Sequence, residues 1–415
     1  MKLSPALALL LSCVAININA QDDNQSDLRI NPLIEASDSA SLEIIEYPSY
    51  INLSSNHIHL NGDDWSGLVH NIKRADSARV SLVHIGDSHL QADMGTAITR
   101  NRLGERYGSA GRALIIPFRL AGTNEPRDYV IKSDAPMLKS RLLKTPWPTE
   151  MGFTGISIKP ETEDFELSLS SKEEFDSIEI FYSGKDLTLC DSSLYAIPSP
   201  KSLKIGLNEA ALDATLHLHS PSPVVIHGFN LTKGNSGISY HVIGNNGATY
   251  GTYNSISGFS TDIAYLSPAL IIVSLGTNES FGKTSDTDMR TQMHSLISNL
   301  RQSCPDAKLL LTTPAECQRR QFRRRGKGRK RRRSAYYSVN TNIKRMRDVI
   351  MDFGIKEQIP VYDFYEVAGG DGSSTKWLSD NLLSKDRVHL TQTGYAVQGN
   401  LFTDALEEIL NSSSK

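Results

Sequence analysis

Apolar runs that could form buried strands alternate with helix-compatible segments over much of the chain. The clearest run, residues 81–85, breaks at Gly86, and residues 92–106 beyond it contain no proline and few β-branched residues. Residues 269–275 are almost continuously apolar, a pattern typical of a strand buried on both faces of a parallel sheet. Further apolar runs occupy residues 113–118, 238–243, 308–313 and 359–364. Strands separated by helical segments predict an α/β fold with a parallel sheet.

Three other segments have helical character. Residues 65–72 precede the first strand, residues 336–353 lie between the last two apolar runs, and residues 395–410 form an amphipathic closing helix. Thr391 is the expected N-cap of this closing helix.

Between residues 125 and 235 the pattern becomes strand-like. No convincing helical periodicity is present, and short alternating runs are separated by Gly, Pro, Ser and Asp. These runs cover residues 155–158, 165–169, 177–182, 214–218 and 224–229. Regular short strands with turn signals predict an antiparallel β-sandwich. We therefore expect a discontinuous domain of residues 46–124 and 236–415, interrupted by a β-sandwich insert of residues 125–235.

Residues 1–20 have the pattern of a secretory signal peptide. A short positive start precedes an apolar run that is too short to span a membrane, and Ala20 is a plausible cleavage position. Cys13 lies in a lipobox-like sequence, so a lipoprotein signal is the alternative. Residues 21–45 are rich in Asp, Ser, Asn and Glu and predict a solvated linker. The signal pattern predicts a periplasmic or extracellular location. No later stretch is apolar enough to cross a bilayer, so we expect the mature chain to be soluble or lipid-anchored.

Three cysteines follow the predicted signal: Cys190, Cys304 and Cys317. Cys304 and Cys317 flank the predicted strand 308–313, whose ends lie too far apart for a disulfide. We expect three free, buried thiols. The cysteine spacing matches no zinc signature, and no glycine-rich phosphate loop precedes a lysine, so neither a metal nor a cofactor is expected.

Three blocks contain residues typical of a serine hydrolase site. Ser88 follows the first strand in a Gly-Asp-Ser sequence, Asn278 follows the apolar run 269–275, and Asp386 and His389 lie together near the C-terminus. A serine hydroxyl needs a base within hydrogen-bond reach, which His389 can supply, and Asp386 can hold the imidazole in the correct tautomer. Each block alone would also fit an ordinary turn or surface loop.

The three blocks, in this order, resemble the SGNH (GDSL-type) hydrolase family from about residue 81 to the C-terminus. The resemblance implies a flavodoxin-like parallel sheet with Ser88, Asp386 and His389 as catalytic residues. It also implies an oxyanion hole that includes the Ser88 backbone N–H and the Asn278 side chain. Most of the family has Asp after this Asn, where this chain has Glu279.

The third oxyanion-hole donor is expected in the glycine cluster after residues 238–243. By position Gly247 is the best match to the family, and Gly244 is the alternative, with a plain glycine turn as the simplest interpretation. His89 and His241 lie near these blocks, and we expect them to be structural or to face the substrate rather than to act as bases.

Basic residues are concentrated between Arg319 and Arg333. These fifteen residues include nine Arg and two Lys, and without them the chain has 33 basic residues against 46 acidic ones. Repulsion between like charges predicts an extended loop. Because this basic loop 319–333 follows a sheet strand, we expect it near the edge that carries Ser88, where it would attract an anionic polymer. The alternative is a solvated loop without a specific partner, and nucleic acid is not an expected partner of a secreted chain.

Within the SGNH family, the layout is most similar to bacterial peptidoglycan O-acetylesterases, which carry a carbohydrate-binding-module-like β-domain after the serine block. The resemblance implies a serine esterase that removes O-acetyl groups from an acetylated glycan. Xylan or another polysaccharide is an alternative substrate, and acyl transfer is an alternative outcome of the same chemistry. An inactive glycan-binding wall protein is the alternative of another class. Trp147 could stack on a sugar ring, although core packing or a domain junction is favoured.

Overall fold

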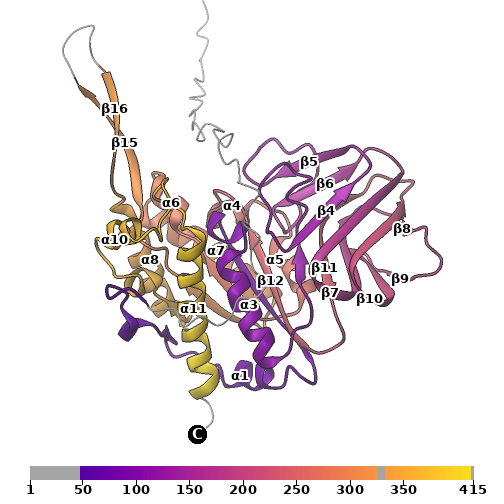
Figure 1. Ribbon diagram of the computed structural model, residues 1–415, viewed down its shortest axis with the longest axis horizontal. Coiled ribbons are helices and arrows are strands. Elements are labelled where there is room, and N and C mark those ends of the chain that lie inside the picture. Colours follow the sequence, from indigo (N-terminus) through magenta and orange to yellow (C-terminus); the bar gives the residue numbers. More distant parts are fainter. Residues whose placement is uncertain (1–46, 326–331, 413–415) are drawn as a thin grey trace, which may run out of the picture. The chain divides into compact units, whose positions relative to one another are not determined.

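The computed structural model describes residues 47–325 and 332–412 (Figure 1), so the predicted signal peptide 1–20 and linker 21–45 lie outside the described residues. Its central sheet has six strands in the order β1-β17-β14-β13-β2-β12. The strands from β17 to β12 are parallel, and β1 pairs antiparallel with β17. The strand bounds are β1 (Ile58–His59), β2 (Arg79–Gly86), β12 (Gly237–Gly244), β13 (Pro268–Ser274), β14 (Lys308–Thr312) and β17 (Val361–Tyr362). The predicted α/β fold with a parallel sheet is confirmed.

Helices cover both faces of the central sheet. Val83 and Ile85 of β2 share a hydrophobic cluster with residues of α7 (Asp286–Ser303) and α8 (Asn342–Glu357). Side chains alternate along a strand, so His84 points to the opposite face. There its ring meets Phe402 of α11 (Gln392–Ser412), which runs beside α3 (Met94–Tyr107) (Figure 1). Shorter helices are α1 (Ser66–Lys73), α2 (Ser88–Gln91), α4 (Tyr250–Asn254), α5 (Phe259–Ile263), α6 (Thr277–Phe281), α9 (Phe364–Val367) and α10 (Ser373–Ser379).

The parallel register brings the ends of three strands to one edge of the central sheet. Gly86 at the end of β2 is paired with Gly244 of β12 and with Ser274 of β13. In open α/β sheets, ligands bind beyond the carboxyl ends of the strands. The segments that follow these three ends carry Ser88, Gly247 and Asn278, so the predicted site residues share this edge.

A second sheet has nine strands and is antiparallel throughout. Its strands are β3 (Ala113–Ile115), β4 (Tyr129–Ser133), β5 (Met137–Arg141), β6 (Ile156–Pro160), β7 (Asp164–Ser183), β8 (Thr188–Leu189), β9 (Tyr195–Pro198), β10 (Ser202–His219) and β11 (Val225–Thr232). Hydrogen bonds join them in one network, in which the long strands β7 and β10 pair with different neighbours along their lengths. The two-sheet sandwich and its bounds, residues 125–235, therefore stay predictions. The apolar run 113–118 supplies β3, which pairs with β11 of this sheet.

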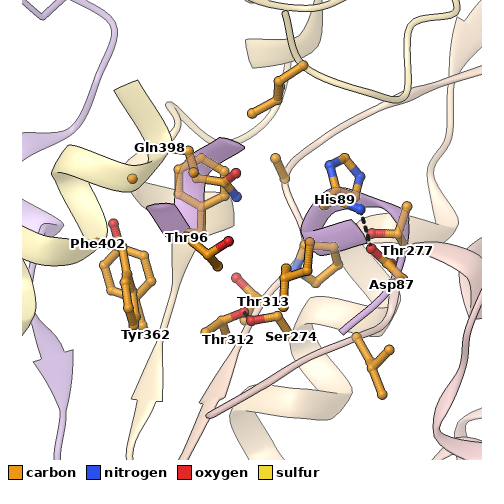
Figure 2. A pocket seen from close by; sticks show the side chains of 18 of the residues that line it. Asp87, His89, Thr96, Ser274, Thr277, Thr312, Thr313, Tyr362, Gln398 and Phe402 are labelled. Atoms are coloured by element: carbon orange, nitrogen blue, oxygen red, sulfur yellow. Dashed lines mark hydrogen bonds between the residues drawn. The ribbon is translucent and has the colours of Figure 1, made fainter. Parts of the chain in front are cut away.

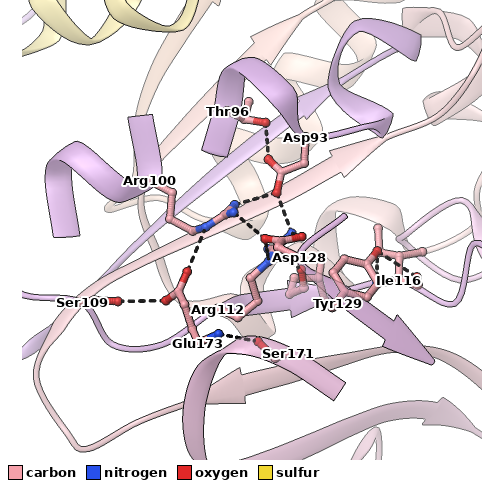
Figure 3. Close-up of polar contacts among 11 residues, drawn as sticks. Asp93, Thr96, Arg100, Ser109, Arg112, Ile116, Asp128, Tyr129, Ser171 and Glu173 are labelled. Carbon is pink, nitrogen blue, oxygen red and sulfur yellow. Dashed lines mark hydrogen bonds and ion pairs between the residues drawn. The ribbon is translucent and has the colours of Figure 1, made fainter. Parts of the chain in front are cut away.

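A buried ionic network joins α3 to the antiparallel sheet (Figure 3). Asp93, directly before α3, accepts hydrogen bonds from Arg100 at 2.7 Å and from Arg112 at 2.5 Å. Asp128, directly before β4, lies 2.9 Å from Arg100 Nη2 and 2.5 Å from Arg112 Nε. Both arginines and Asp93 are buried. Buried charges are tolerated only when they are paired, so this network fixes α3, which closely follows the Ser88 turn.

A separate hairpin of β15 (Gln318–Arg325) and β16 (Arg332–Val339) corrects two predictions. The basic segment 319–333 was expected as an extended loop, but its residues 319–325 and 332–333 belong to β15 and β16, and its residues 326–331 lie outside the described residues. Residues 336–339, expected within a helix, belong to β16, and α8 begins at Asn342. The Tyr336 hydroxyl donates to Gln321 at 2.6 Å, and the Arg323 guanidinium lies 5.4 Å from the Tyr336 ring centroid. Such cross-strand contacts offset the repulsion between the arginines.

Three smaller predictions can be compared with the fold. Thr391 Oγ1 accepts a hydrogen bond from Gly394 N at 3.1 Å, so Thr391 is the N-cap of α11 as predicted. Cys304 and Cys317 are free and buried, but Cys190 is exposed, which corrects the prediction of a third buried thiol. Cys190 follows β8, an edge strand of the antiparallel sheet. Within residues 47–325 and 332–412, no helix is long and apolar enough to cross a membrane.

Candidate active site

Ser88, His389 and Asp386 form one hydrogen-bonded chain. Ser88 Oγ lies 2.8 Å from His389 Nε2, although 301 residues separate them in sequence. His389 Nδ1 lies 2.7 Å from Asp386 Oδ2. In this arrangement the imidazole can accept the serine proton while the carboxylate holds the opposite ring nitrogen.

A tight turn presents the serine hydroxyl. Ser88 is the first residue of α2, and Asp87 caps this helix by accepting a hydrogen bond from His89 N at 2.9 Å. A Cβ at Gly86 would lie 2.7 Å from the Leu90 side chain and 2.8 Å from a backbone oxygen of β13. Glycine is therefore needed for β2 to run directly into the turn.

The Asp386 carboxylate is fixed by its own loop. Its Oδ1 accepts hydrogen bonds from Val388 N at 2.9 Å, from His389 N at 3.0 Å and from Ser384 Oγ at 2.6 Å. Burial tends to raise the pKa of Asp386, but the hydrogen bond and charge of His389 and the loop donors hold this pKa well below its usual range. Asp386 is therefore ionised and presents Oδ2 to His389.

The histidines around the site differ in their proton affinity. Burial alone would lower the pKa of His389, but the hydrogen bond and charge of Asp386 outweigh burial and raise this pKa. The ring of His89 lies 5.3 Å from that of His389, and burial is the main cause that lowers the pKa of His89. Burial also lowers the pKa of His241, in β12, to about 3. Neutral imidazoles at His89 and His241 fit structural roles.

The three predicted oxyanion donors differ in their hydrogen bonding. Among the described residues, neither Ser88 nor Gly247 donates its backbone N–H to a protein acceptor. Asn278 Nδ2 donates to Asp87 Oδ2 at 3.2 Å and to Ala248 O at 3.0 Å. Asn278 thus bridges the serine turn and the glycine loop with both of its amide hydrogens. To face an oxyanion, it would have to release one of these bonds.

Gly244 and Gly247 occupy different environments. Gly244 ends β12 against α2, where a Cβ would lie 2.4 Å from Gln91 N. Gly247 lies in the loop beyond, with a φ of +83° that favours glycine, and the nearest atom to its Cβ position is Leu143 Cγ at 3.6 Å. Gly244 therefore permits close packing of backbone against backbone, whereas Gly247 lies in a more open turn and its N–H has no protein acceptor among the described residues.

Glu279 connects two segments of the site, a role that the sequence did not indicate. Its Oε1 accepts a hydrogen bond from Tyr250 N at 2.9 Å, and its Oε2 accepts one from Gly276 N at 3.1 Å. Burial raises the pKa of Glu279 to about 7. The side chain thus joins the helix after the Gly247 loop to the turn before Asn278. The Gly276 contact has the local spacing of a helix capping box, but Tyr250 belongs to a separate segment, so no local sequence pattern indicates the connection.

A cavity of about 80 Å³ lies next to the serine turn (Figure 2). Its lining includes His84, Asp87 and His89, but neither Ser88 nor His389 is among the described residues that line it. Burial lowers the pKa of His84 to about 3, so this cavity wall carries a neutral imidazole. The cavity therefore backs the serine turn and does not contain the reacting groups.

Within the described residues, no group of three or more His, Cys, Asp and Glu side chains could hold a metal ion. Trp147 packs partly buried against the hydrophobic core, and its Nε1 donates to Leu142 O at 3.2 Å. These contacts agree with a packing role for Trp147.

The parallel sheet, the serine turn and the Ser–His–Asp contacts resemble the arrangement of SGNH-type hydrolases and are suited to serine esterase chemistry. Residues 228–397 match the sequence model of the GDSL-like Lipase/Acylhydrolase family. This range begins after Ser88, whose place in the site follows from the fold. The predicted resemblance to SGNH-type hydrolases is thus confirmed.

Several solved structures resemble this chain in fold. The structure of a peptidoglycan O-acetylesterase is 18% identical in sequence, and the match covers 86% of this chain and 99% of that chain with a TM-score of 0.67. A lipase/acylhydrolase from Enterococcus faecalis is 18% identical over 42% of this chain and 78% of its own, with a TM-score of 0.30. A GDSL-like lipase from Bacteroides thetaiotaomicron is 22% identical over 41% and 76%, with a TM-score of 0.31. A comparison with curated proteins finds no match.

Proposed function

We propose that this chain is a carbohydrate esterase that removes O-acetyl groups from peptidoglycan. The observation that carries the proposal is the Ser88–His389–Asp386 contact chain, in a fold shared with a peptidoglycan O-acetylesterase. A signal peptide at residues 1–20 would direct the protein to the periplasm or the cell exterior, where peptidoglycan is accessible.

In the first half of the reaction, Ser88 Oγ attacks the acetyl carbonyl carbon while His389 Nε2 takes the serine proton. Negative charge on the carbonyl oxygen is met by the backbone N–H groups of Ser88 and Gly247 and by the Asn278 amide. Loss of one such donor typically costs about 3–4 kcal/mol of transition-state stabilisation. Protonated His389 then gives its proton to the departing sugar oxygen, which leaves acetylated Ser88.

In the second half, His389 takes a proton from water, which attacks the carbonyl carbon of the acetyl-serine. The bond between Ser88 Oγ and the acetyl group then breaks, His389 returns the proton to Ser88 Oγ, and acetate leaves. The ionised Asp386 stabilises the imidazolium that forms in each half and holds its orientation. A sugar hydroxyl in place of water would give acyl transfer with the same groups.

Two regions are proposed to hold the polymer. The antiparallel sheet would act as a carbohydrate-binding-module-like β-sandwich. Leu143, in the turn after β5, lies beside Gly247 and supports a position of this turn at the border of the site. The basic segment 319–333 would attract an anionic polymer at low ionic strength. Neutralising its arginines should weaken binding to cell-wall sacculi at low salt, and unchanged binding would exclude this role.

The test is acetate release from O-acetylated peptidoglycan and from acetylated xylan, with the protein and with Ser88→Ala. Release from peptidoglycan that is lost in Ser88→Ala supports the proposal. Preference for xylan would retain the mechanism and change the substrate. Glycan binding without acetate release from either polymer would indicate a binding protein.

A further inference from the structure

The start of β15 and the end of β16, which together form the base of the basic hairpin, contact the loop that carries Asp386 and His389. Gln318, the first residue of β15, donates its backbone N–H to Arg387 O at 2.9 Å. In return, Arg387 Nη1 donates to Gln318 Oε1 at 2.8 Å. The Arg387 guanidinium also lies 4.2 Å from the ring centroid of Tyr337 in β16. Both strands of the hairpin therefore hold the residue that directly follows Asp386.

The backbone of Arg387 shows why these contacts matter. Its φ is +63°, a conformation that side chains other than glycine rarely adopt and that persists only when the surroundings enforce it. Beyond this residue the N–H groups of Val388 and His389 both point to Asp386 Oδ1, at 2.9 and 3.0 Å. The conformation of Arg387 thus sets the position of the carboxylate that holds His389.

The base of the hairpin also contacts α6, the helix that carries Asn278. Arg319 Nη2 donates to Ser280 O at 2.7 Å, and its guanidinium lies 5.3 Å from the Phe281 ring centroid. Asn340, at the end of β16, donates its amide to Ser280 Oγ at 2.8 Å. One small region therefore supports two separate segments of the site.

We propose that Arg387 is a positioning residue of the active site and that Gln318 and Tyr337 are the clamp that holds it. This inference rests on the proposed roles of Ser88, Asp386 and His389 but not on the identity of the glycan. An arginine suits the position because its planar guanidinium can stack on Tyr337 while it donates to Gln318, which the ammonium group of lysine cannot reproduce.

The test measures kcat and KM for p-nitrophenyl acetate, an ester too small to reach the outer hairpin. Arg387→Ala and Tyr337→Ala should each lower kcat about tenfold with KM changed less than about twofold, because the base is misplaced and ester binding is not. Tyr337→Phe keeps the ring and is the matched control, with kcat within about twofold of the unaltered protein. The double variant Arg387→Ala/Tyr337→Ala should be no slower than Arg387→Ala, because Arg387→Ala alone already removes the contact between Arg387 and Tyr337.

A second measurement separates this inference from the proposed substrate. The rate at which a fluorophosphonate probe labels Ser88 reports the activation of the serine without any glycan, and Ser88→Ala is its blank. Slow labelling of Arg387→Ala supports the positioning role even if no acetylated glycan is hydrolysed. If Arg387→Ala fails to fold, Arg387→Lys replaces it, with an expected fall in labelling rate of at least about threefold. Labelling and turnover of the folded variants at the unaltered rate would overturn the inference.

Discussion

Glu279 offers a quantitative test, because its side chain is buried and accepts two backbone N–H groups. Burial raises its pKa from 4.5 to about 7. Below pH 4.5 the carboxyl group is protonated in both the folded and the unfolded chain, so its contribution to stability is complete. As the pH rises toward 7, the unfolded chain loses this proton while the folded chain retains it, and the free energy of unfolding falls.

The size of this fall follows from the two pKa values. They differ by about 2.5, which corresponds to about 3 kcal/mol in the free energy of unfolding. Glu279→Gln cannot ionise, so it should lack this part of the pH dependence. The free energy of unfolding of Glu279→Gln, taken relative to that of the unaltered protein, should therefore rise by about 3 kcal/mol as the pH is raised from below 4.5 to above about 7.

The assay is urea unfolding of both proteins at several pH values that span this window. Other titrating groups contribute equally to both proteins, so the difference between the two curves isolates Glu279. Glu408→Gln, at an exposed position on α11, is the matched control and should follow the unaltered protein. A constant difference between Glu279→Gln and the unaltered protein across the window would refute the reasoning.

Three further predictions concern the site and its support. Asp386→Asn should lower kcat about ten-thousand-fold. Because the Asp386 carboxylate raises the His389 pKa, the acidic limb of the kcat/KM profile of this variant should move to lower pH. An unmoved limb would contradict the role of Asp386. Gly244→Ala should lower the free energy of unfolding in urea by about 1–3 kcal/mol, since its Cβ would lie 2.4 Å from a backbone nitrogen; unchanged stability would show that α2 can yield. Arg112→Met should cost about 3–5 kcal/mol in the same assay, because the buried Asp93 and the partly buried Asp128 lose a partner. A loss below about 1 kcal/mol would show that water replaces the guanidinium.

The sequence was most informative where structure depends on neighbouring residues. The apolar runs 81–85 and 269–275 correspond to β2 and β13, as expected for strands of a parallel sheet that are covered on both faces. The short spacing of Asp386 and His389 similarly allowed one loop to bring both side chains together. Their contact with Ser88 followed from the family order of the blocks rather than from any local pattern.

Contacts between distant segments could not be derived from one sequence. Arg387 resembles any charged loop residue until its partners Gln318 and Tyr337 are known. The arginine-rich hairpin was not predicted for the same reason. Charge repulsion predicts a loop, and the contact of Tyr336 with Gln321 that opposes this repulsion exists only once the strand register is fixed. Hydrogen bonding also joins β3 to the antiparallel sheet, although its sequence fits either sheet.

The distance in sequence between Ser88 and His389 has a consequence for the newly made protein. A ribosome completes the serine turn long before it adds the histidine 301 residues later. Contacts over such separations form slowly, because a long loop must close first. A nascent chain would therefore carry a serine without its base, and hydrolytic activity would begin only when α11 docks beside α3 and the preceding loop settles at the sheet edge.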